Sequence, residues 1–221
     1  MRVNILQHAS DEGPGAILTW AQQHHHEVFI YHPNDFGQFP TADETDMLVV
    51  LGSPASPNDD EIWIKQERAL IKACLEQHIP YLGICFGGQQ LAKVLGGEVK
   101  DAPVKEVGWA PVTLQQPLPG MPKQVEVLHW HQQQFTIPAG AELLFSNENV
   151  VEQGFMYQQR AIALQFHLEP LMDNLREIVI NDGSYAAGSV LGQTPTQIID
   201  HGVPRANAIV LGKLLDFLAQ N

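Results

Sequence analysis

The sequence predicts an α/β protein, built as a three-layer sandwich with a mostly parallel central sheet and an antiparallel extension. Strand and helix patterns alternate through the first half of the chain, and strand patterns dominate the second half. Such alternation implies right-handed units in which helices cover both faces of a parallel sheet. Hydrophobic residues make up 44% of the 221 residues, enough to fill one core, so we expect residues 1–221 to form a single domain.

The first half of the chain carries four strand patterns separated by helix patterns. The third strand, 47–51, is apolar without interruption, as expected of a strand buried on both faces. A helix follows over 61–77, where the apolar residues repeat along one face. The remaining strands are predicted at 3–6, 27–31 and 81–84, and the remaining helices near 17–21 and from Phe86 to a stop at Gly96-Gly97.

The second half changes character, because its strand patterns are broken by Pro and Gly and predict the antiparallel extension. These strands are expected at 107–114, 125–130, 143–146 and 151–157, followed by a buried strand at 161–166 and by helices at 171–180 and 206–219. Segment 181–205, between those two helices, is rich in Gly, Ser, Thr and Pro. Its composition predicts the loosest part of the chain and a candidate mobile flap.

The charge balance excludes several classes of partner. The chain has 25 acidic and 12 basic residues, a formal net charge of −13, and its Lys and Arg residues are scattered. We therefore expect no nucleic-acid partner and no membrane partner. Neither a membrane-spanning run nor a secretory signal is visible, and the two cysteines, Cys74 and Cys85, provide no disulfide framework. A cytoplasmic location is the expectation that follows.

The strongest functional signal is Gly83-Ile84-Cys85-Phe86-Gly87, which lies between a predicted buried strand and a helix. The spacing matches a nucleophile elbow with Cys in place of Ser. The tight turn leaves no room for side chains at the flanking glycines, and the helix N-terminus favours the thiolate form of Cys85. The alternative is an inert cysteine in a glycine-rich turn, as predicted for Cys74 on the apolar face of its helix.

A cysteine nucleophile needs a base and a group that orients the base. His167 and Glu169 follow the buried strand 161–166, and residues i and i+2 of an extended segment point to the same side. They therefore project together where α/β active sites form. The order of nucleophile, histidine, acid differs from the nucleophile, acid, histidine of α/β-hydrolases. A second rival, the PfpI-like group of proteins, usually has a histidine directly after the elbow cysteine, where this chain has Phe86.

Three blocks of sequence together resemble the class I (triad) glutamine amidotransferases. Residues 83–89 (GICFGGQ) are similar to their nucleophile block, and 165–170 (QFHLEP) resembles their Q-F-H-P-E block, with Leu168 in place of Pro. Residues 51–54 (LGSP) are similar to their G-G-P loop. The resemblance implies a flavodoxin-like α/β fold and attack on the side-chain amide of glutamine or of another γ-glutamyl compound through a thioester.

The same resemblance implies roles for individual residues. Cys85 is the expected nucleophile, His167 the general base and then acid, and Glu169 the group that orients His167. The backbone N–H groups of Gly52 and Phe86 are expected to form the oxyanion hole. The resemblance further assigns substrate binding to two side chains, Gln89 and His131.

One stretch departs from the family pattern. Residues 128–133 (LHWHQQ) resemble an H-W-H-G-D segment that shapes the glutamine pocket, but Gln132 and Gln133 stand in place of Gly-Asp. The grip on the amino-acid end of the substrate, and strict glutamine specificity, are therefore open. Residues 106–109 (EVGW) resemble a segment of stand-alone members similar to GMP synthase, where we expect a structural role.

No cofactor and no metal site are expected from the sequence. It contains no phosphate-binding loop of the G-x-x-x-x-G-K-[ST] type and no Cys/His cluster with zinc spacing. The run His24-His25-His26 is a metal-binding alternative to an ordinary solvated surface feature. Three functions stay open: a stand-alone γ-glutamyl hydrolase, a glutaminase subunit that supplies ammonia to a separate ATP-dependent synthetase, and a non-catalytic binding module on the same fold.

Overall fold

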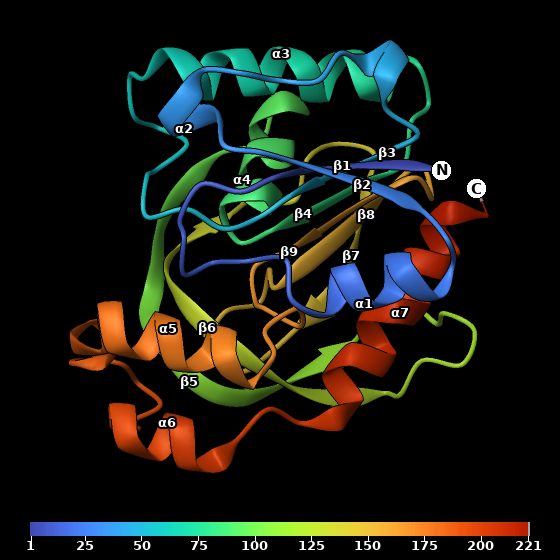
Figure 1. The fold of residues 1–221 in the computed structure, drawn as a ribbon. Helices are drawn as coiled ribbons and strands as arrows, with labels where there is room; N and C mark the ends of the chain where they lie inside the picture. Colours follow the sequence, from blue (N-terminus) through green and yellow to red (C-terminus); the bar gives the residue numbers. More distant parts are fainter. Residues whose placement is uncertain (221) are drawn as a thin grey trace.

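A nine-stranded sheet forms the centre of the protein (Figure 1). The structure is a computed structural model that describes residues 1–220. In spatial order the strands are β2 (Glu27–Tyr31), β1 (Arg2–Leu6), β3 (Met47–Val50), β4 (Tyr81–Ile84), β9 (Ala161–Leu164), β8 (Gly154–Tyr157), β7 (Ala141–Ser146), β5 (Val99–Leu114) and β6 (Gln124–Phe135). The first five run parallel and the last four pair antiparallel, which confirms the predicted sheet and its extension.

Helices cover both faces of the parallel strands, so the three predicted layers are present (Figure 1). One face is covered by α1 (Ala16–Gln23) and α7 (Arg205–Ala219), and the other by α3 (Ile62–Glu76) and α4 (Phe86–Val94). Each face has its own apolar cluster, and two short elements, α2 (Pro33–Phe36) and η1 (Ala42–Glu44), precede β3. Within residues 1–220, none of the helices combines the length and the apolar character that crossing a bilayer requires.

The antiparallel strands β5 and β6 are longer than the sequence pattern predicts. β5 begins at Val99 rather than at 107, and β6 continues to Phe135 rather than ending at 130. The additional ladder ends on the buried pair Val99 and Phe135 but otherwise joins mostly polar residues, for example Asp101 opposite Gln133, and the register shifts between Asp101 and Glu106. Backbone pairing, rather than an apolar face, extends these strands, so hydrophobic periodicity does not detect them.

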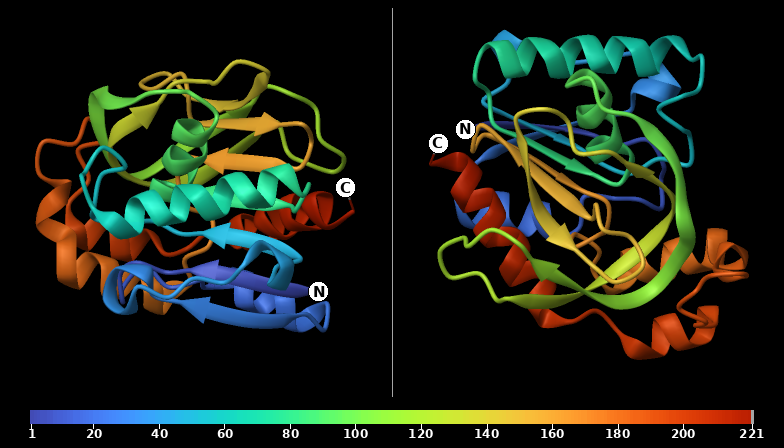
Figure 2. Two further views of the ribbon diagram at one scale, coloured as in Figure 1. Left: turned by 90° about the horizontal axis from the view of Figure 1, so that it is seen from above. Right: turned by 180° about the vertical axis from the view of Figure 1, so that it is seen from behind.

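Segment 181–205 contains more regular structure than its composition predicts. After α5 (Met172–Asp182) come the 3₁₀ turn η2 (Gly183–Ala186) and the helix α6 (Pro195–His201), beside the long strand β5 in Figure 2. Thr194 caps α6, since its Oγ1 accepts a hydrogen bond from the N–H of Gln197 at 3.2 Å. Ile198 is fully buried, and its carbonyl accepts a hydrogen bond from the Trp109 indole at 3.0 Å. The segment that composition predicts to be the loosest thus contains two regular elements.

The topology brings the three sequence blocks to one edge of the sheet. β3, β4 and β9 are neighbours and parallel, so their carboxyl ends meet. Gly52 follows β3, Cys85 follows β4, and His167 lies just beyond β9. Crevices at the carboxyl ends of parallel strands are where ligand sites of open α/β sheets form.

Candidate active site

Cys85 lies on a strained turn between β4 and α4. Its backbone has φ 50° and ψ −106°, a conformation that L-residues seldom adopt, and its N–H donates to the Leu164 carbonyl at 2.7 Å. A Cβ on Gly83 would lie 2.4 Å from the backbone of Gly87, and one on Gly87 would lie 2.1 Å from the Val50 carbonyl oxygen. The flanking glycines are therefore required by close backbone contact, as the elbow pattern predicts.

His167 and Glu169 form a buried pair beside this turn. His167 Nδ1 lies 2.6 Å from Glu169 Oε1, and the N–H of Leu168 donates to Glu169 Oε2 at 3.0 Å. The His167 backbone is fixed as well, because it exchanges hydrogen bonds of 2.8 and 3.3 Å with Leu128 of β6. The spacing of two residues thus places the carboxylate against the imidazole, as expected, and strand pairing holds the ring in position.

The electrostatics favour a protonated imidazole at His167. Burial by itself lowers the pKa of His167, but the Glu169 carboxylate and a hydrogen bond with Cys85 outweigh it and raise the pKa well above the usual value. Because Nδ1 is occupied by Glu169, Nε2 is left to face the thiol. A thiolate and an imidazolium side by side form the activated state of cysteine hydrolases.

Gly52 lies directly against this pair, at the start of the loop that follows β3. A Cβ at this position would fall 1.8 Å from Glu12 Oε2 and 3.3 Å from His167 Cε1, so a larger residue would displace the Glu12 carboxyl. Phe86 is the first residue of α4, and its N–H has no acceptor within the helix. The structure therefore places both residues predicted for the oxyanion hole at the same edge of the sheet as Cys85.

A second histidine–carboxylate pair supports the Gly52 loop, and nothing in the sequence pattern indicates it. His8 Nδ1 donates to the Gly52 carbonyl at 3.0 Å, and His8 Nε2 lies 2.7 Å from Glu67 Oε2. Both side chains are fully buried. Burial lowers the pKa of His8, but the Glu67 carboxylate more than offsets it, so the pKa is raised. The raised pKa favours the imidazolium form, in which both nitrogens donate and the loop is fixed.

A cleft of about 320 Å³ opens above Cys85. Gln89, predicted to bind substrate, lies in its wall and donates to Gln165 Oε1 at 3.2 Å, and Gln165 in turn reaches Cys85 Sγ at 3.7 Å. Gln165 is therefore a further polar group at the nucleophile. The cleft is lined by Glu12, Ser53, Pro54, Ala55, Cys85, Gln89, Trp130, His131, Gln132, Gln133, Asp182 and Tyr185.

The cleft is acidic. Glu12 and Asp182 line it together with a smaller adjoining pocket, to which Asp11 also contributes, and neither lining includes a Lys or an Arg. Burial raises the pKa of Glu12 to about 7, with His167 opposing the shift and Glu169 adding to it. Asp182 accepts a hydrogen bond from the Trp130 indole at 3.0 Å. A cationic group of a substrate therefore meets carboxylates on this side of the site.

The stretch that departs from the family pattern has its own contacts. Gln133 Oε1 accepts a hydrogen bond from the Ser56 hydroxyl at 2.8 Å, which ties β6 to the loop that follows β3. Gln132 is exposed. The two glutamines thus line the cleft without bringing a charge to it, which is the difference that the sequence indicates.

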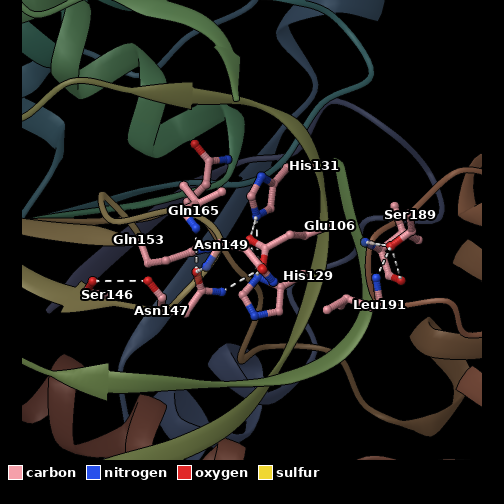
Figure 3. Close-up of polar contacts among 12 residues, drawn as sticks. Glu106, His129, His131, Ser146, Asn147, Asn149, Gln153, Gln165, Ser189 and Leu191 are labelled. Atoms are coloured by element: carbon pink, nitrogen blue, oxygen red, sulfur yellow. Dashed lines mark hydrogen bonds and ion pairs between the residues drawn. The ribbon is translucent and has the colours of Figure 1, made fainter. Parts of the chain in front are cut away.

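His131 lies in the wall of the cleft and also belongs to a buried group with Glu106 and His129 (Figure 3). His129 and His131 are two residues apart on β6, and Glu106 joins them because this residue of β5 pairs with His131. They form the one group of three or more potential ligands that residues 1–220 place within 4.8 Å. The run His24-His25-His26 does not form such a group, since His24 instead contacts the Trp20 carbonyl at 2.9 Å and Asp216 at 3.2 Å.

Comparison with known proteins shows the family of the chain. The family model "Glutamine amidotransferase class-I" matches residues 16–184. A glutamine amidotransferase-like protein of Salmonella typhimurium is 30% identical over 183 residues, which cover 76% of each protein. A glutamine-hydrolyzing GMP synthase of Thermomicrobium roseum is 30% identical over 163 residues, 72% of this chain but 29% of that larger protein.

Solved structures agree in the fold. A glutamine amidotransferase of Thermotoga maritima has a TM-score of 0.90 at 25% identity, covering 100% of this chain and 99% of that one. A glutamine amidotransferase of Methylobacillus flagellatus has a TM-score of 0.87 at 27% identity, with coverage of 99% and 92%. The expected flavodoxin-like fold and family resemblance are both confirmed, and the chain belongs to the class-I glutamine amidotransferases.

Proposed function

We propose that the protein hydrolyses the γ-glutamyl amide of glutamine or of a related γ-glutamyl compound through a thioester on Cys85. The observation that carries the proposal is the contact between the imidazole of His167, the carboxylate of Glu169 and the elbow cysteine. Membership of the family supports the hydrolysis of glutamine amides in general. The assignment to individual residues rests on geometry and chemistry.

In the first half-reaction, Cys85 Sγ attacks the amide carbon and the carbonyl oxygen becomes an oxyanion. The N–H groups of Gly52 and Phe86 donate to that oxyanion. His167 then transfers its proton to the leaving nitrogen, the C–N bond breaks, and ammonia or an amine departs. Glu169 stabilises the imidazolium before this transfer and holds the ring in the tautomer that places the proton on Nδ1.

In the second half-reaction, water attacks the thioester. His167, now neutral, removes a proton from the water, and a second oxyanion forms in the same hole. Cys85 leaves as the thiolate, glutamate is released, and the imidazolium–thiolate pair is restored. One water is consumed, and one glutamate and one amine are produced.

The substrate's glutamyl end lies in the acidic cleft. Gln89 and His131 contact the γ-glutamyl chain, and the α-ammonium group faces Glu12 and Asp182. In this proposal the two acidic side chains bind the α-ammonium group, in place of the aspartate that the family segment has at the position of Gln133. Because no Lys or Arg lines the cleft, the α-carboxylate is bound by neutral donors, and substrates with a modified α-carboxylate are tolerated.

A covalent label tests the proposal. A glutamine-mimicking diazo ketone should label one cysteine, and peptide mass spectrometry should find it on Cys85. Cys74 is a matched internal control, because it is fully buried and burial raises its pKa to about 12. Cys85→Ala should lose both the label and glutamate release. If neither wild type nor Cys85→Ala released glutamate from any of a panel of γ-glutamyl substrates, the proposal would be contradicted.

A second candidate is a glutaminase subunit that delivers ammonia to a separate ATP-dependent synthetase. One subunit of a glutamine-hydrolyzing GMP synthase, from Sulfolobus acidocaldarius, favours it, because that subunit is 35% identical over 97 residues, 42% of this chain and 52% of its own length. Affinity purification from cell extract should then recover an ATP-using enzyme, and its addition should raise glutaminase activity. High activity of the isolated chain, unchanged by extract, favours the stand-alone hydrolase instead.

A third candidate, a non-catalytic binding module, ranks last. It predicts that neither Cys85 nor Cys74 reacts with the diazo ketone. Labelling of Cys85 without turnover of any substrate would show that the cysteine is reactive. That result would favour the second candidate, a subunit that acts together with a synthetase.

A further inference from the structure

Three buried side chains direct polar atoms at one point between β5 and β6 (Figure 3). His129 Nδ1 lies 3.4 Å from His131 Nε2 and 3.6 Å from Glu106 Oε2. His131 Nε2 lies 3.3 Å from the same Glu106 Oε2. The side chains of Glu106 and His129 are fully buried, and that of His131 nearly so.

Short charge-assisted hydrogen bonds do not account for this convergence. A charge-assisted bond between an imidazole and a carboxylate is about 2.7–2.9 Å long, as at His167–Glu169 and His8–Glu67, where the distances are 2.6 and 2.7 Å. All three distances in the group are longer, yet too short for lone pairs that face one another without a positive charge. The other ring nitrogens, His129 Nε2 and His131 Nδ1, have no hydrogen-bond partner in residues 1–220.

The spacing of the three atoms is that of ligands around a tetrahedral cation. Zinc binds imidazole nitrogen and carboxylate oxygen at about 2.0–2.2 Å, which puts neighbouring ligand atoms of a tetrahedral site about 3.4 Å apart. The three observed separations are 3.3, 3.4 and 3.6 Å. Two neutral imidazoles and one carboxylate are also a ligand set that zinc and its neighbours in the first transition row prefer.

Three side-chain amides donate hydrogen bonds to the carboxylate of Glu106, as outer-sphere residues do to a carboxylate that binds a metal. Gln153 Nε2 donates to Glu106 Oε2 at 2.6 Å, and the side-chain amides of Asn147 and Asn149 donate to Oε1 at 2.7 and 3.0 Å. Three donors fix the carboxylate plane and keep it ionised without a basic side chain. His131 also borders the Cys85 cleft, so the group adjoins that cleft.

We propose that Glu106, His129 and His131 bind one divalent transition-metal ion of the zinc class, with the fourth position open. The ion clamps β5 to β6. Leu128, the residue before His129, exchanges two backbone hydrogen bonds with His167, so the clamp also fixes the strand that positions the proposed base. Ion binding is therefore coupled to the geometry of the Cys85 site, although it does not depend on the proposed hydrolysis.

Metal titration of the full chain tests the proposal. The background variant Cys85→Ser with His24→Asn and His25→Asn removes the competing thiol and breaks up the surface histidine run. After treatment with a chelator, this protein should bind one Co²⁺ per chain with the intense visible bands of tetrahedral cobalt. Zn²⁺ should displace the cobalt and raise the unfolding temperature.

Glu106→Gln is the test variant, since it keeps the size of the side chain and removes the anionic ligand. It should weaken Zn²⁺ binding by at least about 100-fold. Glu126→Gln is the matched control, because Glu126 lies on the paired strand β6 and also contacts a histidine, His201, at 3.3 Å, but its side chain is exposed. This variant should leave binding unchanged. If Glu106→Gln does not fold, X-ray absorption of the Zn²⁺-loaded background protein decides, and it should show nitrogen and oxygen ligands with imidazole scattering. No Co²⁺ or Zn²⁺ binding by the background protein, binding retained in Glu106→Gln, or a non-imidazole shell would overturn the proposal.

Discussion

Two buried histidine–carboxylate pairs stand on either side of the Gly52 loop, and the difference between them separates chemistry from support. His167–Glu169 and His8–Glu67 have similar contacts, 2.6 and 2.7 Å, and in both the histidine pKa is raised. The second nitrogen of His8 is used by the Gly52 carbonyl. That of His167 faces a thiol. The pair itself is therefore not what defines a catalytic histidine; what the remaining nitrogen faces decides its role.

The largest expected effect comes from the proposed catalytic pair. His167→Gln removes the proton carrier and should lower the kcat of γ-glutamyl hydrolysis by about 10⁴-fold or more. Steady-state kinetics on the most active γ-glutamyl substrate measures this. Loss of less than about tenfold would mean that His167 is a second structural histidine, like His8.

Glu169→Gln tests the orienting partner. The amide keeps the contact with His167 Nδ1 but no longer stabilises the imidazolium, so kcat should fall by about 10²–10⁴-fold. The pKa of His167 should fall as well, which shifts the acidic limb of the kcat/KM profile. An unchanged pH profile would show that Glu169 does not set the charge of His167.

Glu67→Gln should act mainly on stability. It removes the charge that compensates a buried imidazolium, and should cost about 2–4 kcal/mol of unfolding free energy at pH 6 while lowering kcat by only about tenfold through the Gly52 loop. Denaturant unfolding at several pH values measures it.

The stability difference between wild type and Glu67→Gln should depend on pH. Because the folded pKa of His8 is raised, the pair's contribution is complete below pH about 6.5 and is lost as pH rises through the folded value. The stability difference between wild type and Glu67→Gln should therefore shrink at high pH. A kcat loss as large as that of Glu169→Gln would erase the distinction between the two pairs.

Glu12→Gln should have the smallest effect on rate and should act on substrate binding. The carboxyl has a pKa of about 7, so it becomes anionic as pH rises through neutrality. Wild-type KM for a substrate with a free α-amino group should fall over that range, and Glu12→Gln should raise KM about tenfold at pH 8 and remove the dependence. Protection of the α-amino group should abolish the difference, and a difference that persists would place Glu12 elsewhere in the mechanism.

The two pairs also differ in how far the sequence predicts them. His167 and Glu169 are two residues apart at the end of a buried strand, so local geometry alone brings them together. His8 and Glu67 are separated by 59 positions and meet only when α3 packs on the sheet. Glu106 and His131 likewise meet through the register of two long strands, whose polar ends carry no hydrophobic pattern.

The fold shows the same contrast between local pattern and contacts of distant segments. The strands that are buried on both faces, such as β3 and β4, coincide with the predicted runs to within one residue. Composition predicts that 181–205 is the loosest segment, yet α6 forms there. The Ile198 carbonyl of α6 accepts a hydrogen bond from the Trp109 indole of β5, and Gln193, just before α6, bonds the Trp109 backbone. Contacts between distant segments, rather than local composition, determine its structure.

The central claim is that Cys85 carries the γ-glutamyl group during turnover. The direct measurement is acid quenching of the protein while it turns over a γ-glutamyl substrate, followed by peptide mass spectrometry. The account predicts a γ-glutamyl thioester on the peptide that contains Cys85, and its accumulation in a variant such as Glu169→Gln if deacylation becomes the slower step. Turnover at full rate without an adduct, and with Cys85→Ala still active, would contradict it.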